Sequence, residues 1–220
     1  MATRETLLAT LRAATMQGGT DPSVAWNALP RGYTQSGSHS HAERLALLIE
    51  RLEGYDATVT QTTPLDLPAT IARVVENSGH RRLVIPPGLP AAWQVPCAEW
   101  LNDSGLTHDE IDAADGVMTA ASCAIADSGT IALHHGPEEG RRVLSLLPDW
   151  HLIILHSSQI VETLPEYFAR FPEPPRLVTW ISGPSATADI EMIRIKGVHG
   201  PRFLSVIIVV EDPTLMAKQA

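Results

Sequence analysis

A loop rich in Ser, Thr, Gly and Asp occupies residues 182–191 and contains the residue types that hold anions. Hydroxyls and backbone amides donate hydrogen bonds to an anion, and glycine lets the backbone approach it closely. The candidate ligand-binding residues of this loop are Ser182, Gly183, Ser185 and Thr187. The alternative is an ordinary connection whose hydroxyls cap a helix and whose Asp189 accepts hydrogen bonds from loop amides.

A histidine on a glycine-rich segment follows, with Gly197, His199 and Gly200 directly before the last apolar stretch of the chain. An imidazole presented in this way can exchange a proton or donate a hydrogen bond to an anion. A glycine turn with a partly exposed histidine is the simpler alternative, since motifs this short often occur by chance.

A third polar segment, Asp127-Ser128-Gly129-Thr130, lies between two short apolar stretches and is typical of a hairpin turn. The turn needs no function, although an Asp at its tip can orient a ligand hydroxyl or a neighbouring histidine. Further ligand-binding candidates are therefore Ser128, Gly129 and Thr130, together with Gly197 and Gly200. The candidates for acid–base or nucleophilic chemistry are Asp127, Asp189, Glu191 and His199.

These three segments are expected to line one pocket at the carboxyl end of a parallel sheet, because ligands in open α/β sheets bind beyond that end. Hydroxyls and amides suit a small anion. The three acidic candidates repel an anion unless Arg194, Lys196 or a helix N-terminus pairs with them. A hydroxylated anion such as a sugar phosphate suits this mixture better than a bare carboxylate.

Two histidine pairs, His39/His41 and His134/His135, resemble metal-ligand pairs. Neither has a recognisable third ligand at useful spacing, and a stable site needs three or four, so we predict no metal. The two cysteines of the chain are too few for an iron–sulfur cluster. Motifs for nucleotide phosphates, for dinucleotides and for a G-x-S-x-G nucleophile do not occur, so we expect no resident cofactor.

The acidic composition limits the classes of partner. The net charge is −9 over 220 residues, whereas a face that binds nucleic acid or an acidic membrane is rich in Lys and Arg. Apolar residues make up 44% of the chain, as in folded globular proteins, yet no apolar run approaches the ~18 residues of a membrane-spanning helix. We find no export signal, and therefore expect a cytoplasmic protein with reduced thiols.

Helix and strand patterns alternate after residue 39 and predict an α/β fold. Three capping boxes mark helix starts: Ser40-x-x-Glu43, Thr107-x-x-Glu110 and Thr163-x-x-Glu166. Strands are predicted over residues 57–61, 83–85, 116–119, 123–126, 151–155, 176–181 and 203–210. The alternation favours a mainly parallel sheet with helices on both faces, and some antiparallel pairing at the 123–133 hairpin. Segments 176–181 and 203–210 are expected to be neighbouring or near-neighbouring central strands.

The first part of the chain differs in character from the rest. Residues 1–38 are predicted to form an N-terminal helix, over residues 3–15, followed by an extended arm or mobile loop. Residues 39–215 are predicted to form one α/β domain, because a chain of this length favours a single large core.

Four segments occur in the order and spacing of the lactate-utilisation protein C family, also called LutC or YkgG, whose shared domain is the LUD domain. These segments are residues 126–130, 144–148, 182–191 and 197–201. The chain resembles this family from Gly116 to Val210, and its N-terminal third matches only in general character. The resemblance implies a fold similar to the sugar-phosphate isomerase and CoA-transferase group (NagB/RpiA/CoA-transferase-like), in agreement with the α/β pattern.

The resemblance also implies a role beside two partner proteins, one of which carries iron–sulfur clusters, in oxidising L-lactate to pyruvate. It supplies no established catalytic residues. Our first hypothesis is therefore an accessory component that binds a small anionic ligand and has no redox cofactor of its own. The alternative is a stand-alone enzyme, acting as fold relatives do on sugar phosphates, acyl-CoA esters or folates, with the acidic residues and histidine named above as acid, base or nucleophile.

Overall fold

The structure, a computed structural model, describes residues 3–15, 21–173, 175–187, 195–196 and 199–212. It divides into two compact units, Met1–Tyr33 and Thr34–Ala220, and each is considered by itself. The expected domain limits, 1–38 and 39–215, stay a prediction.

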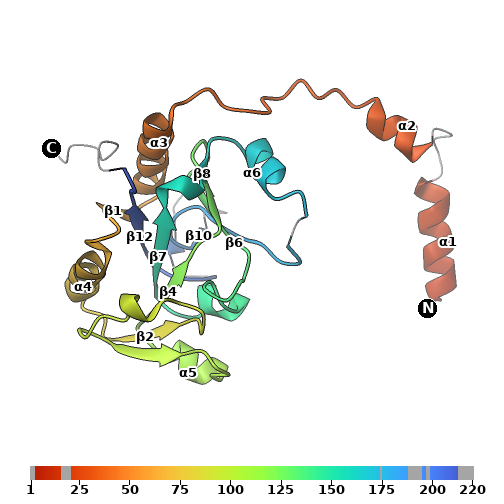
Figure 1. Ribbon diagram of the computed structural model, residues 1–220. Helices are drawn as coiled ribbons and strands as arrows, with labels where there is room; N and C mark the ends of the chain where they lie inside the picture. The colour runs from red at the N-terminus through yellow and green to blue at the C-terminus, as the bar shows by residue number, and fades with distance from the viewer. Residues whose placement is uncertain (1–2, 16–20, 174, 188–194, 197–198, 213–220) are drawn as a thin grey trace. The chain divides into compact units, whose positions relative to one another are not determined.

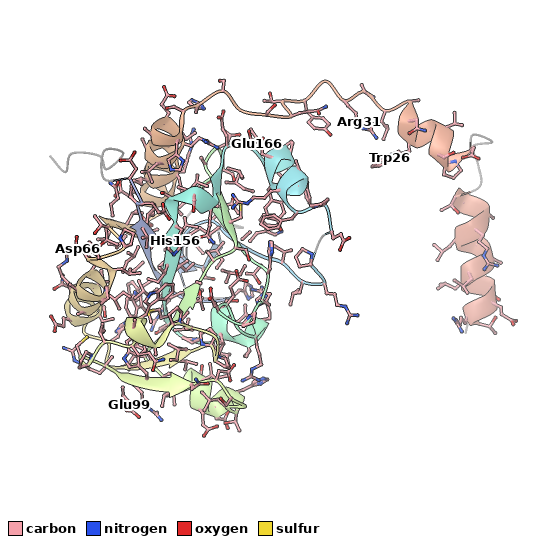
Figure 2. The ribbon with its side chains drawn as sticks, viewed as in Figure 1. Trp26, Arg31, Asp66, Glu99, His156 and Glu166 are labelled. Atoms are coloured by element: carbon pink, nitrogen blue, oxygen red, sulfur yellow. The ribbon has the colours of Figure 1, made fainter. Side chains whose placement is uncertain are left out.

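The N-terminal unit contains two helices, α1 (Arg4–Thr15) and α2 (Pro22–Asn27), and none of their residues is buried. The first helix was predicted, but α2 lies where we expected an extended arm. Asp21 begins α2 by accepting a hydrogen bond of 2.7 Å from the backbone N–H of Ser23, and Pro22 is tolerated in the first turn. After this helix, the guanidinium of Arg31 lies 4.8 Å from the ring centre of Trp26 (Figure 2).

Six strands of the second unit form the main sheet, in the order β1-β12-β7-β4-β2-β3, and each neighbouring pair is parallel (Figure 1). Their bounds are β1 Thr58–Thr62, β2 Arg82–Ile85, β3 Glu99–Asn102, β4 Gly116–Ala120, β7 Trp150–His156 and β12 Phe203–Val209. The predicted mainly parallel sheet is confirmed. Strand β12 lies inside the sheet, as its continuous apolar run predicted.

Helix α4 (Leu67–Ser78) and the 3₁₀ turn η1 (Ala91–Trp93) cover one face of this sheet. Side chains of α4 spaced for one helical face, such as Ile71 and Val75, are buried against Ile154 of β7 and Ile207 of β12. Successive residues of a strand point to opposite faces, so the residues next to Ile154 and Ile207 in the chain pack on the other face of the sheet.

The other face of the main sheet is covered by α3 (His41–Gly54), α5 (His108–Asp112) and a small second sheet. That sheet has the order β8-β5-β6-β9, with β5 Cys123–Ile125, β6 Thr130–Leu133, β8 Ile160–Val161 and β9 Thr179–Ile181. Leu48 of α3 and Ile131 of β6 are fully buried in one cluster with Ile153 of β7. Helices therefore lie on both faces, and the antiparallel hairpin predicted over 123–133 is present as β5–β6.

The prediction that segment 176–181 is a central strand of the main sheet is wrong. Only Thr179–Ile181 form a strand, and this strand, β9, pairs antiparallel with β6 at the edge of the small sheet. Leu177 and Trp180 are exposed, so the apolar residues of the segment do not indicate burial on two faces. The loop that follows β9 consequently starts from the small sheet.

All three predicted capping boxes are formed, and two carboxylates at the start of α6 (Leu164–Arg170) also hold the segment that enters α3. Glu162 accepts hydrogen bonds from the backbone N–H groups of Ser38 and His39, at 3.1 and 2.7 Å. Glu166 accepts one of 2.9 Å from the N–H of Gly37, and Figure 2 shows Glu166 on α6 beside this segment. The two carboxylates therefore fix the entry to α3 against α6.

The remaining elements connect the two sheets. They are the 3₁₀ turns η2 (Arg142–Ser145) and η3 (Ser157–Gln159), and the short strands β10 (Ala186–Thr187) and β11 (Ile195–Lys196), which pair antiparallel with each other. Within the described ranges, no helix has the length and apolar character that crossing a membrane requires.

Candidate functional site

A hollow of about 260 Å³ lies between the two sheets, and we call it the first hollow. His151 and Leu204, the second residues of β7 and β12, line it together with Arg142 and Ser145 of η2. Its other described lining residues are Leu146, 179–186 and 199–201. The hollow thus lies at the amino ends of the main strands. The prediction of a site at their carboxyl ends is wrong for this hollow, because the loop after β9 starts from the small sheet.

Arg142 gives the first hollow its positive charge. Its Nη1 donates to the hydroxyl of Thr179 at 2.9 Å and to the hydroxyl of Ser145 at 3.0 Å. Ser145 in turn donates to the carbonyl of Arg142 at 2.9 Å. These contacts orient the planar guanidinium, whose fork of N–H donors matches the oxygens of a carboxylate or phosphate.

The loop after β9 and the histidine segment are joined to each other within this hollow. The backbone N–H of Ser185 donates to the carbonyl of Pro201 at 2.8 Å, and the N–H of His199 donates to the Ser185 hydroxyl at 3.3 Å. Gly183 has φ 81°, and a Cβ there would lie 2.6 Å from the Cβ of Tyr55. Glycine is therefore required at 183 by backbone conformation and by the close approach of α3's end.

His151 is a buried, neutral base on the wall of the first hollow. Its side chain extends from β7 and its Nε2 lies 2.9 Å from the hydroxyl of Thr119 on β4. Burial lowers the pKa of His151 from 6.5 to about 3, because the imidazolium cannot be hydrated there. A neutral imidazole offers a ligand one donor and one acceptor nitrogen, and one of the two is occupied by Thr119.

A second hollow of about 500 Å³ adjoins the first, and we call it the apolar hollow. Its lining residues are Ile125, Asp127, Ser128, Thr130, Leu164, Phe168, Trp180 and Ser182. The turn 127–130 is anchored by the N–H of Asp127, which donates to the carbonyl of Glu162 at 3.0 Å. The hydroxyl of Thr130 lies 2.8 Å from that of Ser182, so this turn touches the loop after β9.

The structure therefore brings the predicted segments together in part. Residues 182–186 and 199–201 share the first hollow, whereas the turn 127–130 lines the neighbouring apolar hollow. Trp180 and Ser182 belong to both linings. Whether the named residues bind a ligand stays a prediction.

Several predicted site residues lie outside the described residues: Asp189, Glu191, Arg194 and Gly197. Thr187 and Lys196 belong to the short strands β10 and β11, and only their backbone pairing is described. Of the four acid–base candidates, Asp127 and His199 are placed, and they line different hollows. Gly129 lies at φ 63° in the turn, against Arg51 of α3, which accounts for glycine there without a ligand.

Three of the four paired histidines have protein partners. His39 Nδ1 lies 2.7 Å from the carboxylate of Glu162, which raises the pKa of His39. His134 Nε2 lies 2.7 Å from the Tyr167 hydroxyl, and His135 Nε2 lies 2.6 Å from the hydroxyl of Thr179. His41 Nε2 is buried without a hydrogen-bond partner among the described residues. Within those residues, no group of three or more His, Cys, Asp or Glu is arranged to hold a metal ion.

Sequence reasoning missed Arg142 and His151 as site residues. Segment 144–148 is one of the four that resemble the family, but the arginine two residues before it belongs to no motif. His151 is the second residue of an apolar strand, and its alternation with Ile153 and Leu155 was the available signal that it points between the sheets.

Comparison with known proteins places the chain in a family. Residues 91–209 match the LUD domain. A lactate utilization protein C of Deinococcus radiodurans is 42% identical over 174 residues, which cover 77% of this chain and 81% of that protein. The protein of the same name in Halalkalibacterium halodurans is 32% identical over 190 residues, covering 79% of this chain and 82% of that one. The chain belongs to the lactate utilization protein C family.

A solved structure supports the same assignment. The crystal structure of a duf162 family protein from Deinococcus radiodurans matches with a TM-score of 0.67 and 36% identity, over 78% of this chain and 99% of that chain. All described residues that line the two hollows lie inside the match to the LUD domain. Both hollows are therefore features of the LUD domain itself.

Proposed function

We propose that this member of the lactate utilization protein C family serves lactate utilisation as a component that binds a small anionic ligand in the first hollow. The role is taken from the names of its relatives, and the ligand class from the chemistry of the hollow. This chain carries out no redox step in that role.

The proposal rests on the groups that surround the guanidinium of Arg142. The described residues lining the first hollow include one guanidinium, several hydroxyls and no carboxylate. Thr179 and Ser145 orient the guanidinium, and the loop from Ser182 to Ser185 brings hydroxyls close to it. A positive charge flanked by hydroxyls and loop amides is suited to a carboxylate or a phosphate.

Binding without catalysis fits the described geometry better than a stand-alone enzyme does. A mechanism in which one group acts as acid and another as base needs both groups within reach of the reacting atoms. His199 and Asp127, the two placed candidates, line separate hollows, and His151 stays neutral across the physiological range. The oxidation of lactate would then belong to partner proteins. Association with iron–sulfur proteins of lactate oxidation, implied by the family resemblance, is part of the proposal and is testable by co-purification.

Direct binding with a matched pair of arginine variants tests the function. Isothermal titration calorimetry of L-lactate, pyruvate and inorganic phosphate should show binding of at least one of these anions to the purified protein. Arg142→Gln should weaken it by about 10- to 100-fold, the value of a charge-assisted hydrogen bond. Arg73→Gln removes an equal charge from the exposed side of α4 and should leave binding unchanged.

Growth provides the second measurement. In a host from which the gene is deleted, the wild-type gene and Arg73→Gln should restore growth on L-lactate, and Arg142→Gln should restore it poorly. Equal growth and equal anion affinity of the two variants, at equal thermal stability, would remove Arg142 from the function. Growth that does not depend on the gene at all would remove the role in lactate utilisation.

A further inference from the structure

The apolar hollow is lined by large apolar side chains that remain exposed to solvent. Leu164, Phe168 and Trp180 are 45%, 52% and 43% exposed, and Ile125 of β5 lies beneath them. Large apolar groups gathered around a concavity mark binding sites more often than scattered single ones do. The ring of Trp180 is supported from within by Tyr167, at 4.8 Å between ring centres.

One side of this hollow is polar, and that side leads to the first hollow. The Ser128 hydroxyl donates to that of Thr130 at 2.8 Å, and Thr130 lies 2.8 Å from the hydroxyl of Ser182. Three hydrogen-bonded hydroxyls thus run from the turn to the loop after β9. Ser182, at the end of this chain, also lines the first hollow.

Two residues along and after β9 belong to the walls of both hollows. Trp180 and Ser182 are two positions apart, so their side chains fall on the same side of the extended chain. Both residues line both hollows. A ligand whose charged group lies near Arg142 therefore meets Trp180 and Ser182 first as it extends toward Phe168.

We propose that the apolar hollow receives the apolar part of the ligand whose charged group binds Arg142. The ligand is then a small organic anion that carries an aromatic or branched apolar group. The inference rests on the proposed anion site and deepens it by naming a ligand class larger than lactate itself. Three features support a small molecule over a protein partner: the hollow is concave, its volume lies within the ~300–1,000 Å³ of small-molecule sites, and it shares Trp180 and Ser182 with a charged pocket.

The test is a series of 2-hydroxy acids that share one charged group and differ in their apolar part. L-lactate, L-3-phenyllactate and 2-hydroxy-4-phenylbutanoate are titrated into the purified full-length protein by calorimetry. At least one aryl acid should bind about 10- to 50-fold more tightly than lactate, from the apolar area that a phenyl ring removes from water. Its binding should also show a more negative heat-capacity change.

Two phenylalanine variants locate the effect. Phe168→Ala should remove most of the gain of the aryl acid while leaving the affinity for L-lactate unchanged. Phe203→Ala is the matched control, because Phe203 is similarly exposed, at 55%, and lines neither hollow. Arg142→Gln should weaken every acid of the series by the same factor, which ties the charged group to the first hollow.

The outcomes separate this inference from the proposed function. Equal affinity for lactate and both aryl acids would overturn the inference and leave the anion site standing. A gain that survives Phe168→Ala would also overturn it. Failure of every acid, together with failure of phosphate and pyruvate, would overturn both. A dimer seen by sedimentation that Phe168→Ala dissociates would assign the hollow to a second copy of the chain and refute the ligand.

Discussion

Acidification should destabilise the protein in a way that depends on His151. Its imidazole is 1% exposed and its pKa is lowered from 6.5 to about 3 by burial. Between these values the unfolded chain binds a proton that the folded protein does not. The stability that the neutral imidazole provides is therefore fully present above about pH 6.5 and is lost as the pH falls toward 3.

The magnitude follows from the size of that interval. One pH unit corresponds to about 1.4 kcal/mol for a group protonated only in the unfolded state. At pH 5 the loss assignable to His151 should be about 2 kcal/mol, and at pH 3 it should be about 4 kcal/mol. His39 acts in the opposite direction, because its pKa is raised by Glu162: that contribution is present below its unfolded pKa and lost as the pH rises. The wild-type curve alone therefore does not isolate His151.

A difference measurement isolates it. Urea unfolding of the wild type and of His151→Gln is followed from pH 7.5 to pH 5. The amide of Gln keeps a hydrogen-bonding group near Thr119 but does not titrate. The free energy of unfolding of the His151→Gln variant should therefore fall by about 2 kcal/mol less than that of the wild type over this pH range. Parallel curves for wild type and His151→Gln would refute a neutral buried imidazole.

Two further predictions concern the loop after β9 and the thiols. Gly183→Ala should lower the free energy of unfolding by about 1–3 kcal/mol, because φ at this position is 81° and the new Cβ meets Tyr55. Gly136→Ala, where the new Cβ enters open space, should change the melting temperature little, and equal melting temperatures of the two variants in calorimetry would contradict the strain. Burial raises the pKa of the Cys123 thiol to about 11, so Cys123 should react with an aromatic disulfide reagent only on unfolding, whereas the half-buried Cys97 should react earlier. Simultaneous reaction of both thiols in the folded protein would disprove this.

Much of the fold was predictable because its signals are local. Each capping box, such as Ser40 with Glu43, satisfies two backbone amides within one turn, so the helix start is readable from four residues. The strand Phe203–Val209 was equally readable, because a run of apolar residues without alternation indicates burial on both faces.

The prediction for segment 176–181 was wrong because the segment has the composition of a buried strand but lies at the edge of the small sheet. Val178 and Ile181 are apolar, but Leu177 and Trp180 are exposed, and pairing is with β6 of the small sheet. Which sheet accepts a short strand depends on partners distant in the chain, and no local pattern records them. This single assignment also reversed the expected end of the sheet for the site.

The site was predictable in its loops and not in its charge. Ser182, Ser185 and His199 were recognised by residue type, and the structure places them around one hollow. Arg142 lies outside any motif and enters the hollow because η2 leads into the amino end of β7. The identity of a cation in a pocket depends on tertiary packing, so residue type alone did not select one arginine among many.

The lining of the first hollow combines residues held by the main sheet with residues of the connections between elements. Strands at their amino ends contribute their second residues, His151 and Leu204, which are fixed by the main sheet and by Thr119. The charge and the hydroxyls come instead from η2 and from the loop after β9, which belong to connections. Changes in those connections can alter the ligand without disturbing the sheet. The Thr130–Ser182 hydrogen bond is then the point at which the two hollows are coupled, because any displacement of the loop at Ser182 moves a shared wall of both.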